Sequence, residues 1–425
     1  MTASVETLSS SPTIVKALTS PGGVEAWHVE SDVVPLFAVS FIFEGGSAHD
    51  PEDKPGVAQM LARLLDEGAG DYDSDAFQER LAARAIELSF NAGNDALGGS
   101  LKTLVKHADE AFELLRLALA EPRFDQDAIE RVRAQTIAGL KYQQNDPGVM
   151  ATRCFFEEGF AGHPYGRPTS GTPESVAAIT RDDLVTMHRA IIARGRVKIA
   201  VVGAVSSDNL ANLLDKVFGH LPEAKPLSVI EHATLQKLGS RIVVDLDVPQ
   251  SVIRFGMNGL AWRDPSFIPA YVLNHILGGG AFTSRLFQEV REKRGLAYSV
   301  GTSLVSYRSA AMTWGYTATK NERVVEALDV IADEMAKLTS EGPSDEELQK
   351  AKDYLIGSYA LGFDTSTKIA HTLAQIAFEG LGIDYIGRRN GLVAAVTQAD
   401  IRSAAERVFG DGRMLTVIAG RPTGV

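Results

Sequence analysis

The chain contains an internal repeat with a period above 200 residues, and this repeat limits the possible folds more than any other feature. Six positions in the first half, Val34-Pro35, Gly45, Asp50-Pro51 and Pro55, recur 214 positions later as Val248-Pro249, Gly259, Asp264-Pro265 and Pro269. Near the ends, residues 176–184 and 196–203 recur 217 positions later as 393–401 and 413–420. Solenoid repeats are only about 20–50 residues long. This much longer period predicts two similar domains.

The boundary between the domains is predicted in a polar, Pro-containing segment. Residues 221–239 interrupt the apolar patterns on either side, and the 425-residue chain is long enough for two large cores. We therefore predict an N-terminal domain at residues 1–222, a linker at 223–239 and a C-terminal domain at 240–425.

Strand and helix patterns alternate within each half. Residues 36–43, 197–202 and 252–256 are β-rich runs between long helical patterns. Asp75, with Gln78 three residues later, predicts a capping box at a helix start. The expected fold class is α+β, with two homologous domains, each a mixed, mostly antiparallel sheet with helices packed on one face.

Composition excludes several classes of protein. A net charge of -12 argues against nucleic acid or anionic lipid as the main partner. The single cysteine, Cys154, rules out an internal disulfide framework and a cysteine-based zinc site. No apolar run approaches the roughly 20 residues of a membrane span, so none is expected. The first 20 residues lack the basic and apolar regions of a signal peptide.

Residues 43–68 resemble the active-site helix of the pitrilysin, insulinase and mitochondrial processing peptidase family, which are inverzincin zinc peptidases. Members carry His-x-x-Glu-His, in which two His on one helical face bind zinc and the Glu activates water. Gln59, Ala62 and Arg63 occupy these three positions here. Taken without the resemblance, residues 56–66 form an ordinary amphipathic helix.

Each of these replacements removes a different chemical role. A Gln amide is a poor zinc ligand, Ala cannot accept a proton, and a guanidinium cation repels a metal ion. The third ligand of the family is a downstream Glu, whose position matches Gly139 or Leu140. We therefore expect this chain to bind no metal and to use no cofactor of its own. A salt bridge from Arg63 to Asp66 or Glu67 is expected instead of a new catalytic centre.

The second half retains another signature of the same family. Residues 278–300 are similar to the segment in which an Arg and a Tyr seven residues apart contact the substrate opposite the zinc, and Arg291 and Tyr298 have this spacing. Both are hydrogen-bond donors suited to a peptide carbonyl and to the negative charge that it develops. Without the resemblance, Arg291 would belong to a solvated charged turn and Tyr298 would be a half-buried strand residue.

The local pattern predicts how this pair is presented. Residues 282–294 indicate a helix with Phe282, Leu286 and Val290 on its core stripe, ended by Gly295 in the left-handed region. Residues 296–305 then indicate a strand. This order brings Arg291 and Tyr298 to one corner.

The resemblance extends over nearly the whole chain, including residues 163–171 and Gly203. It implies half of a clamshell that encloses an unfolded peptide, and in some members a heterodimer with zinc on one subunit and the Arg/Tyr pair on the other. We therefore expect a zinc-lacking subunit of a heterodimeric metalloendopeptidase, inactive alone, whose homologous partner carries the zinc. The alternative is a structural or peptide-binding scaffold without a role in catalysis.

Other catalytic sites lack support in the sequence. The nine His residues include no pair at spacings of two, three or four, and neither a Gly-x-Ser-x-Gly elbow nor a phosphate-binding loop is present. Secreted members of the family favour the periplasm as the location, with the cytoplasm as the alternative.

Overall fold

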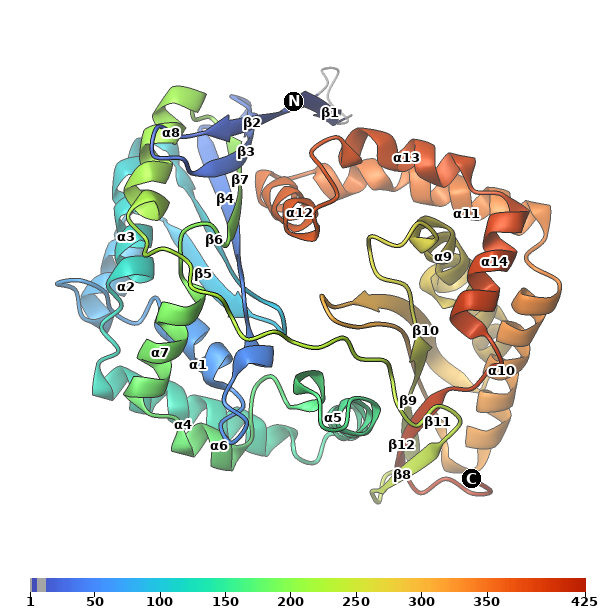
Figure 1. Cartoon of the computed structure of the whole chain (residues 1–425). Coiled ribbons are helices and arrows are strands. Elements are labelled where there is room, and N and C mark those ends of the chain that lie inside the picture. The colour runs from blue at the N-terminus through green and yellow to red at the C-terminus, as the bar shows by residue number, and fades with distance from the viewer. Residues whose placement is uncertain (1, 6–12) are drawn as a thin grey trace. The chain divides into compact units, whose positions relative to one another are not determined.

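The computed structural model describes residues 2–5 and 13–425, which form two compact units (Figure 1). The first unit consists of residues up to 141, together with 168–229 and 359–389. The second consists of 142–167, 230–358 and 390–425. Both units are discontinuous in sequence. The predicted division at residues 223–239 has one continuous domain on each side and does not contain this exchange of segments. No helix of the described part of the chain is long and apolar enough to cross a membrane.

Each unit is built on one mixed sheet. The strands of the first are β1 (Thr2–Val5), β2 (Thr13–Thr19), β3 (Glu25–Glu30), β4 (Leu36–Glu44), β5 (Glu87–Ala92), β6 (Ala96–Leu104) and β7 (Val197–Gly203), in the order β1-β2-β3-β7-β4-β6-β5. Those of the second are β8 (Arg241–Asp245), β9 (Gln250–Asn258), β10 (Ala297–Ser306), β11 (Ala311–Lys320) and β12 (Leu415–Gly420), in the order β10-β11-β9-β12-β8. Only the β3–β7 and β8–β12 pairs are parallel among these neighbours.

The two sheets confirm the duplication. Read from β3, the first sheet runs β3-β7-β4-β6-β5, and the second runs β8-β12-β9-β11-β10 in the same topological order. The repeated helix starts are also equivalent, because Thr180 with Asp183 and Thr397 with Asp400 both form capping boxes. The predicted α+β class and the mixed, mostly antiparallel sheets are confirmed.

Helices follow the strands in both halves. Those of the first half are α1 (Val57–Leu64), α2 (Ser74–Ala83), α3 (Ala108–Ala120), α4 (Gln126–Gln143), α5 (Pro147–Gly159), α6 (Pro173–Ala178), α7 (Arg181–Ile191) and α8 (Ser207–Leu214). Those of the second half are α9 (Phe267–Asn274), α10 (Val324–Ser340), α11 (Asp345–Gly357), α12 (Ser366–Glu379), α13 (Tyr385–Ala395) and α14 (Gln398–Phe409). The predicted cap of α2 is wrong by two residues, because the side chain of Asp73, not Asp75, accepts from the Ala76 N–H.

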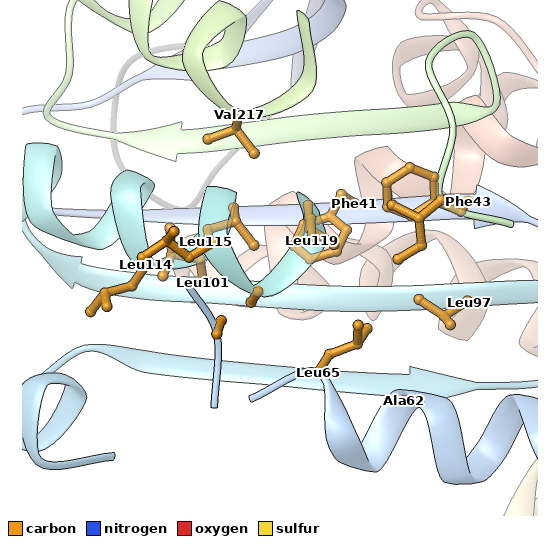
Figure 2. Close-up of a cluster of buried hydrophobic side chains, with 14 of the residues drawn as sticks. Phe41, Phe43, Ala62, Leu65, Leu97, Leu101, Leu114, Leu115, Leu119 and Val217 are labelled. Atoms are coloured by element: carbon orange, nitrogen blue, oxygen red, sulfur yellow. The ribbon is translucent and has the colours of Figure 1, made fainter. Parts of the chain in front are cut away.

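Strand alternation assigns the two faces of the first sheet to different helices. Phe37, Val39, Phe41 and Phe43 of β4 point to a core shared with α1, α3 and α7, and Figure 2 shows part of this cluster. Ala38 and Ile42 point to the opposite face. That face is covered by α12, a helix from the second half of the sequence (Figure 1).

The second sheet receives a helix in return. Helix α5, from the first half, packs on β9 and β12 of the second unit. The ring of Phe155 fills a notch at Gly256, where a Cβ atom would lie 2.7 Å from Phe155 Cζ. The guanidinium of Arg254 donates to Thr152 Oγ1 over 3.0 Å. The halves therefore exchange one helix each, so the sheets have helices on both faces and not only on the one that we predicted.

Candidate functional site

Helix α1 is the element that corresponds to the zinc helix, and burial rather than metal holds it in place. Both carboxylate oxygens of the buried Asp50 accept from backbone N–H groups at the helix start, those of Gly56 at 2.7 Å and Ala58 at 2.9 Å. Val57, Ala58, Met60, Leu61, Ala62 and Leu64 are all buried in the first core. The helix is thus specified by its cap and its apolar face.

The three zinc-motif positions of α1 have different environments. The Gln59 amide is half-buried and donates to the carbonyl oxygen of Ala92, at the end of β5. Ala62 is 1% exposed and belongs to the core cluster, as Figure 2 shows. Arg63 is exposed and its guanidinium donates to Thr136 Oγ1 of α4 over 3.2 Å. The Gln59 amide thus already has a hydrogen-bond partner, the Ala62 methyl group is buried, and Arg63 is a cation, so none of the three is available as a metal ligand.

Helix α4 stands where the family's third zinc ligand would come from. Its Thr136 faces Arg63, and Gly139 and Leu140 follow within the next turn. Leu140 packs against the first core, whereas a Cβ atom at Gly139 would meet nothing within 4 Å. Among the residues that the structure describes, no group of three or more His, Cys, Asp or Glu side chains could hold a metal ion. These residues do not fit zinc.

The acids near Arg63 are not its partners. Glu67 pairs with Arg131 and also accepts from the hydroxyl of Ser74 at 2.5 Å, so the predicted salt bridge from Arg63 is wrong, and Arg63 instead donates to Thr136. Burial raises the pKa of Asp66 to about 6, and the neighbouring charge of Glu67 raises it further, against hydrogen bonds that lower it. Asp66 is therefore a carboxyl held in a poorly solvated place, three residues after Arg63 in the sequence.

The retained pair is stacked on the second unit. Arg291 lies in a π-helical turn, η7 (Phe287–Glu292), and Tyr298 lies at the start of β10. The guanidinium carbon of Arg291 is 4.6 Å from the centre of the Tyr298 ring. It is also 4.7 Å from the centre of the Phe287 ring. Arg291 is therefore in contact with two aromatic rings, and the predicted convergence with Tyr298 is present in the structure.

The segment that connects Arg291 to Tyr298 explains why the two side chains lie close together. Gly295, with φ of 57°, ends the helix in the left-handed region, as predicted. The register of β10 with β11 then shifts between Ala297 and Val300, so that β10 has a bulge-like irregularity at residues 298–299. Bulges change the direction of a side chain at the edge of a sheet. Tyr298 lies at this irregularity and is 82% exposed.

The prediction of a core stripe is wrong for one of its three residues, Phe282. Leu286 and Val290 are fully buried, but Phe282 is 68% exposed. A separate 3₁₀ turn, η6 (Ala281–Thr283), precedes the helix, so Phe282 is out of phase with the stripe. Its ring instead contacts the Phe287 ring edge to face, with centroids 5.0 Å apart. Phe282, Phe287, Arg291 and Tyr298 form a continuous aromatic and cationic group, which we call the Arg/Tyr cluster.

Phe287 was not among the predicted members of this cluster. The signal was available, because Phe287 precedes Arg291 by four residues and thus lies on the same helical face. Chemically, the cluster presents a guanidinium and a phenol hydroxyl, both donors, beside β10, the last strand of its sheet. A stacked guanidinium keeps its N–H groups directed sideways, where they can donate to a carbonyl oxygen.

Comparison with family models places both halves in one peptidase family. Residues 29–173 match the model described as insulinase, peptidase family M16. Residues 178–355 match the model described as the peptidase M16 inactive domain. Together the two models span both the zinc-motif positions and the Arg/Tyr cluster.

Individual relatives agree with this result. A protein of Helicobacter pylori named non-peptidase homolog YmxG is 26% identical over 359 residues, 84% of this chain and 83% of the relative. An uncharacterized zinc protease of Streptomyces coelicolor is 29% identical over 413 residues, 95% of this chain and 89% of the relative. Both relatives match the chain along most of their length.

Solved structures show the same fold. A Pseudomonas fluorescens structure titled as a peptidase M16 inactive domain superposes with a TM-score of 0.90 at 28% identity, covering 96% of this chain and 98% of the other. A Helicobacter pylori structure titled as a protease gives a TM-score of 0.87 at 18% identity, covering 96% and 99%. By sequence and by fold, the chain therefore belongs to the M16 (insulinase) peptidase family, as an inactive member in which Gln59, Ala62 and Arg63 stand at the zinc-motif positions.

Proposed function

We propose that this chain is the zinc-lacking subunit of a heterodimeric metalloendopeptidase. A homologous partner would carry zinc and the general base. This chain would contribute Arg291 and Tyr298, which would reach the partner's reaction centre in trans. The observation that carries the proposal is the Arg/Tyr cluster, in which an 82% exposed tyrosine is held against a guanidinium.

The role of each residue follows from its chemistry. Water attack on a peptide carbonyl places negative charge on the carbonyl oxygen, and donors aimed at that oxygen stabilise the transition state. The Arg291 guanidinium supplies charge and N–H groups, and the Tyr298 hydroxyl supplies a second donor. The rings of Phe287 and Tyr298 both contact the guanidinium and so restrict its position. No proton transfer is assigned to this chain.

The proposed substrate is an unfolded peptide in extended conformation. Strand β10 is the last strand of its sheet and carries Tyr298, so a peptide that added to its outer edge would pass beside the Arg/Tyr cluster. Main-chain hydrogen bonds would then give affinity with little dependence on sequence.

The test combines metal analysis with reconstitution. The chain is purified alone and also recovered from native extract with whatever M16 homologue it binds, and zinc and cleavage of an unfolded casein substrate are measured for both samples. We expect zinc and activity only in the assembled sample. Stoichiometric zinc and strong activity in the isolated chain would overturn the proposal. Full activity of an assembled Arg291→Ala, Tyr298→Phe variant would favour a scaffold without a role in catalysis.

We also propose that the protein acts in the periplasm, because the family that it resembles includes secreted members. Fractionation of the native host with an antibody to this chain tests the location. Recovery with cytoplasmic markers would contradict it and would leave the subunit proposal intact.

A further inference from the structure

A second feature of the first unit lies outside the zinc-motif helix. A hollow of about 810 Å³ opens between the end of α3, helix α7 and the segment 220–227. Its volume lies within the range of roughly 300–1,000 Å³ that ligand pockets have. The Arg/Tyr cluster belongs to the other unit, so the hollow needs an explanation of its own.

The floor of the hollow is apolar and uncharged. Phe124 and Val185 line it, together with His188, whose Nε2 lies 2.8 Å from the carbonyl oxygen of Leu119. The His188 ring also meets the Phe124 ring edge to face, with centroids 5.9 Å apart. Burial lowers the pKa of His188, and the nearby charge of Arg189 lowers it further, against the bond to Leu119. The imidazole is therefore neutral at pH 7 and forms part of an apolar surface.

The rim of the hollow carries an excess of positive charge. Arg181, Arg189 and Lys225 line it and are exposed. The two acids that also line it already have cationic partners, since Glu121 pairs with Arg116 at 2.7 Å and Glu223 with Arg194 at 3.4 Å. Within the described chain, neither Arg189 nor Lys225 forms an ion pair.

We infer that this hollow binds an acidic peptide segment, with an apolar side chain on the floor beside Phe124 and carboxylates on Arg189 and Lys225. A small inorganic anion could satisfy the cations but would leave the apolar floor uncovered. A nucleic acid would be repelled by the net charge of the chain. The site is accessory to the proposed peptidase role and does not depend on it.

The experiment measures peptide binding to the full-length chain by fluorescence anisotropy at low salt. The probe is a short fluorescein-labelled peptide of Glu residues around a central Phe. Two further probes replace all Glu by Lys or replace the Phe by Gly. We expect the Glu/Phe peptide to bind, the Lys peptide not to bind, and the Gly peptide to bind at least about tenfold more weakly, given the cost of losing a buried aromatic side chain.

Variants connect binding to the hollow. Arg189→Glu combined with Lys225→Glu should weaken the Glu/Phe peptide at least about tenfold, because two attractive charges become repulsive. Lys106→Glu combined with Arg402→Glu is the matched control, since both residues are exposed and the change in net charge is the same. The control should change the dissociation constant less than about twofold. Circular dichroism and thermal unfolding establish that both variants are folded.

Several results would overturn the inference. These are no binding of the Glu/Phe peptide by the wild-type chain, equal binding of the Lys peptide, equal weakening by the control variant, or complete competition by inorganic phosphate or by DNA. Loss of catalytic activity in a reconstituted heterodimer has no bearing on this result, because the assay uses this chain alone.

Discussion

The two halves share a sheet order, yet they treat the helix after the first long strand differently. In the second half the positions 214 residues after Gln59, Ala62 and Arg63 are Leu273, Ile276 and Leu277, which are all buried. The first half buries only Ala62 and keeps Gln59 and Arg63 polar. Packing therefore accounts for this helix fully in one half and only partly in the other.

In the Arg/Tyr cluster, by contrast, packing does not explain why these side chains are present. Tyr298 and Phe282 are 82% and 68% exposed, so burial gains little from them. Helix α1, by contrast, is held by its cap and core even without a metal. The comparison teaches that packing holds the zinc-motif helix in place, whereas burial does not account for the Arg/Tyr cluster, which we propose to serve contacts outside the chain.

The largest effect is expected at the cluster. In a reconstituted heterodimer, Arg291→Ala and Tyr298→Phe should each lower kcat by about 10²–10³-fold, which is the usual cost of removing one oxyanion donor. Peptide cleavage and gel filtration measure turnover and assembly separately. Arg294→Ala is the control, because Arg294 lies in the same segment and, like Arg291, pairs with a neighbouring glutamate, in its case Glu289. Unchanged turnover in the assembled Arg291 variant would contradict the proposed role of the cluster and remove this difference between the two halves.

The next largest effect is expected at Ala62, the buried zinc-motif position. Ala62→Glu should lower the free energy of unfolding by about 3 kcal/mol, because it places a carboxyl in the first core. Ala134→Glu on the exposed side of α4 should change it by less than about 0.5 kcal/mol. Urea unfolding measures both. If Ala62→Glu costs no more than its control, the metal site is still open.

A smaller effect is expected from Asp66, and it depends on pH. The pKa of Asp66 rises from 3.8 to about 6 on folding, mainly through burial. The folded state therefore holds the proton more tightly, and stability falls as pH rises from about 4 to 6. Asp66→Asn should remove roughly 1–3 kcal/mol of this fall. Urea unfolding across this range tests it, and the exposed Asp333→Asn should keep the wild-type dependence.

The smallest effect is expected from Arg63. Its hydrogen bond to Thr136 joins α1 to α4 at the surface. Arg63→Met should lower the free energy of unfolding by about 0.5–1 kcal/mol. A double-mutant cycle with Thr136→Val should give a coupling of similar size. Zero coupling would show that the bond does not stabilise the helix pair.

The sequence predicted the parts of this structure that depend on local pattern or on repetition. The strands at 36–43, 197–202 and 252–256 are all present because β-branched and aromatic runs between turn residues favour strands. Phe282 was assigned to the core because helical spacing was extended through a 3₁₀ turn. The cap of α2 was misplaced because several acids stand close together there, and only the backbone geometry distinguishes Asp73.

The helix exchange could not be predicted in this way. Periodicity shows which face of α5 or α12 is apolar, but it does not show which sheet that face will cover. The alternating residues of β4, which are apolar on both faces, were a usable signal that this strand is covered twice. The identity of the covering helix depends on contacts between residues more than 100 positions apart.

The exchanged helices also bear on how such a chain could arise. Helices α5 and α12 occupy equivalent places in the repeat, and each covers the sheet of the other half. In each half this helix packs on the sheet of the other half and not on its own. A single ancestral repeat with the same arrangement would have had one uncovered sheet face, unless a second copy of the repeat covered it with its helix. The present chain is therefore equivalent to a domain-swapped dimer fused into one polypeptide. Neither half, if expressed alone, would contain all the parts of either unit.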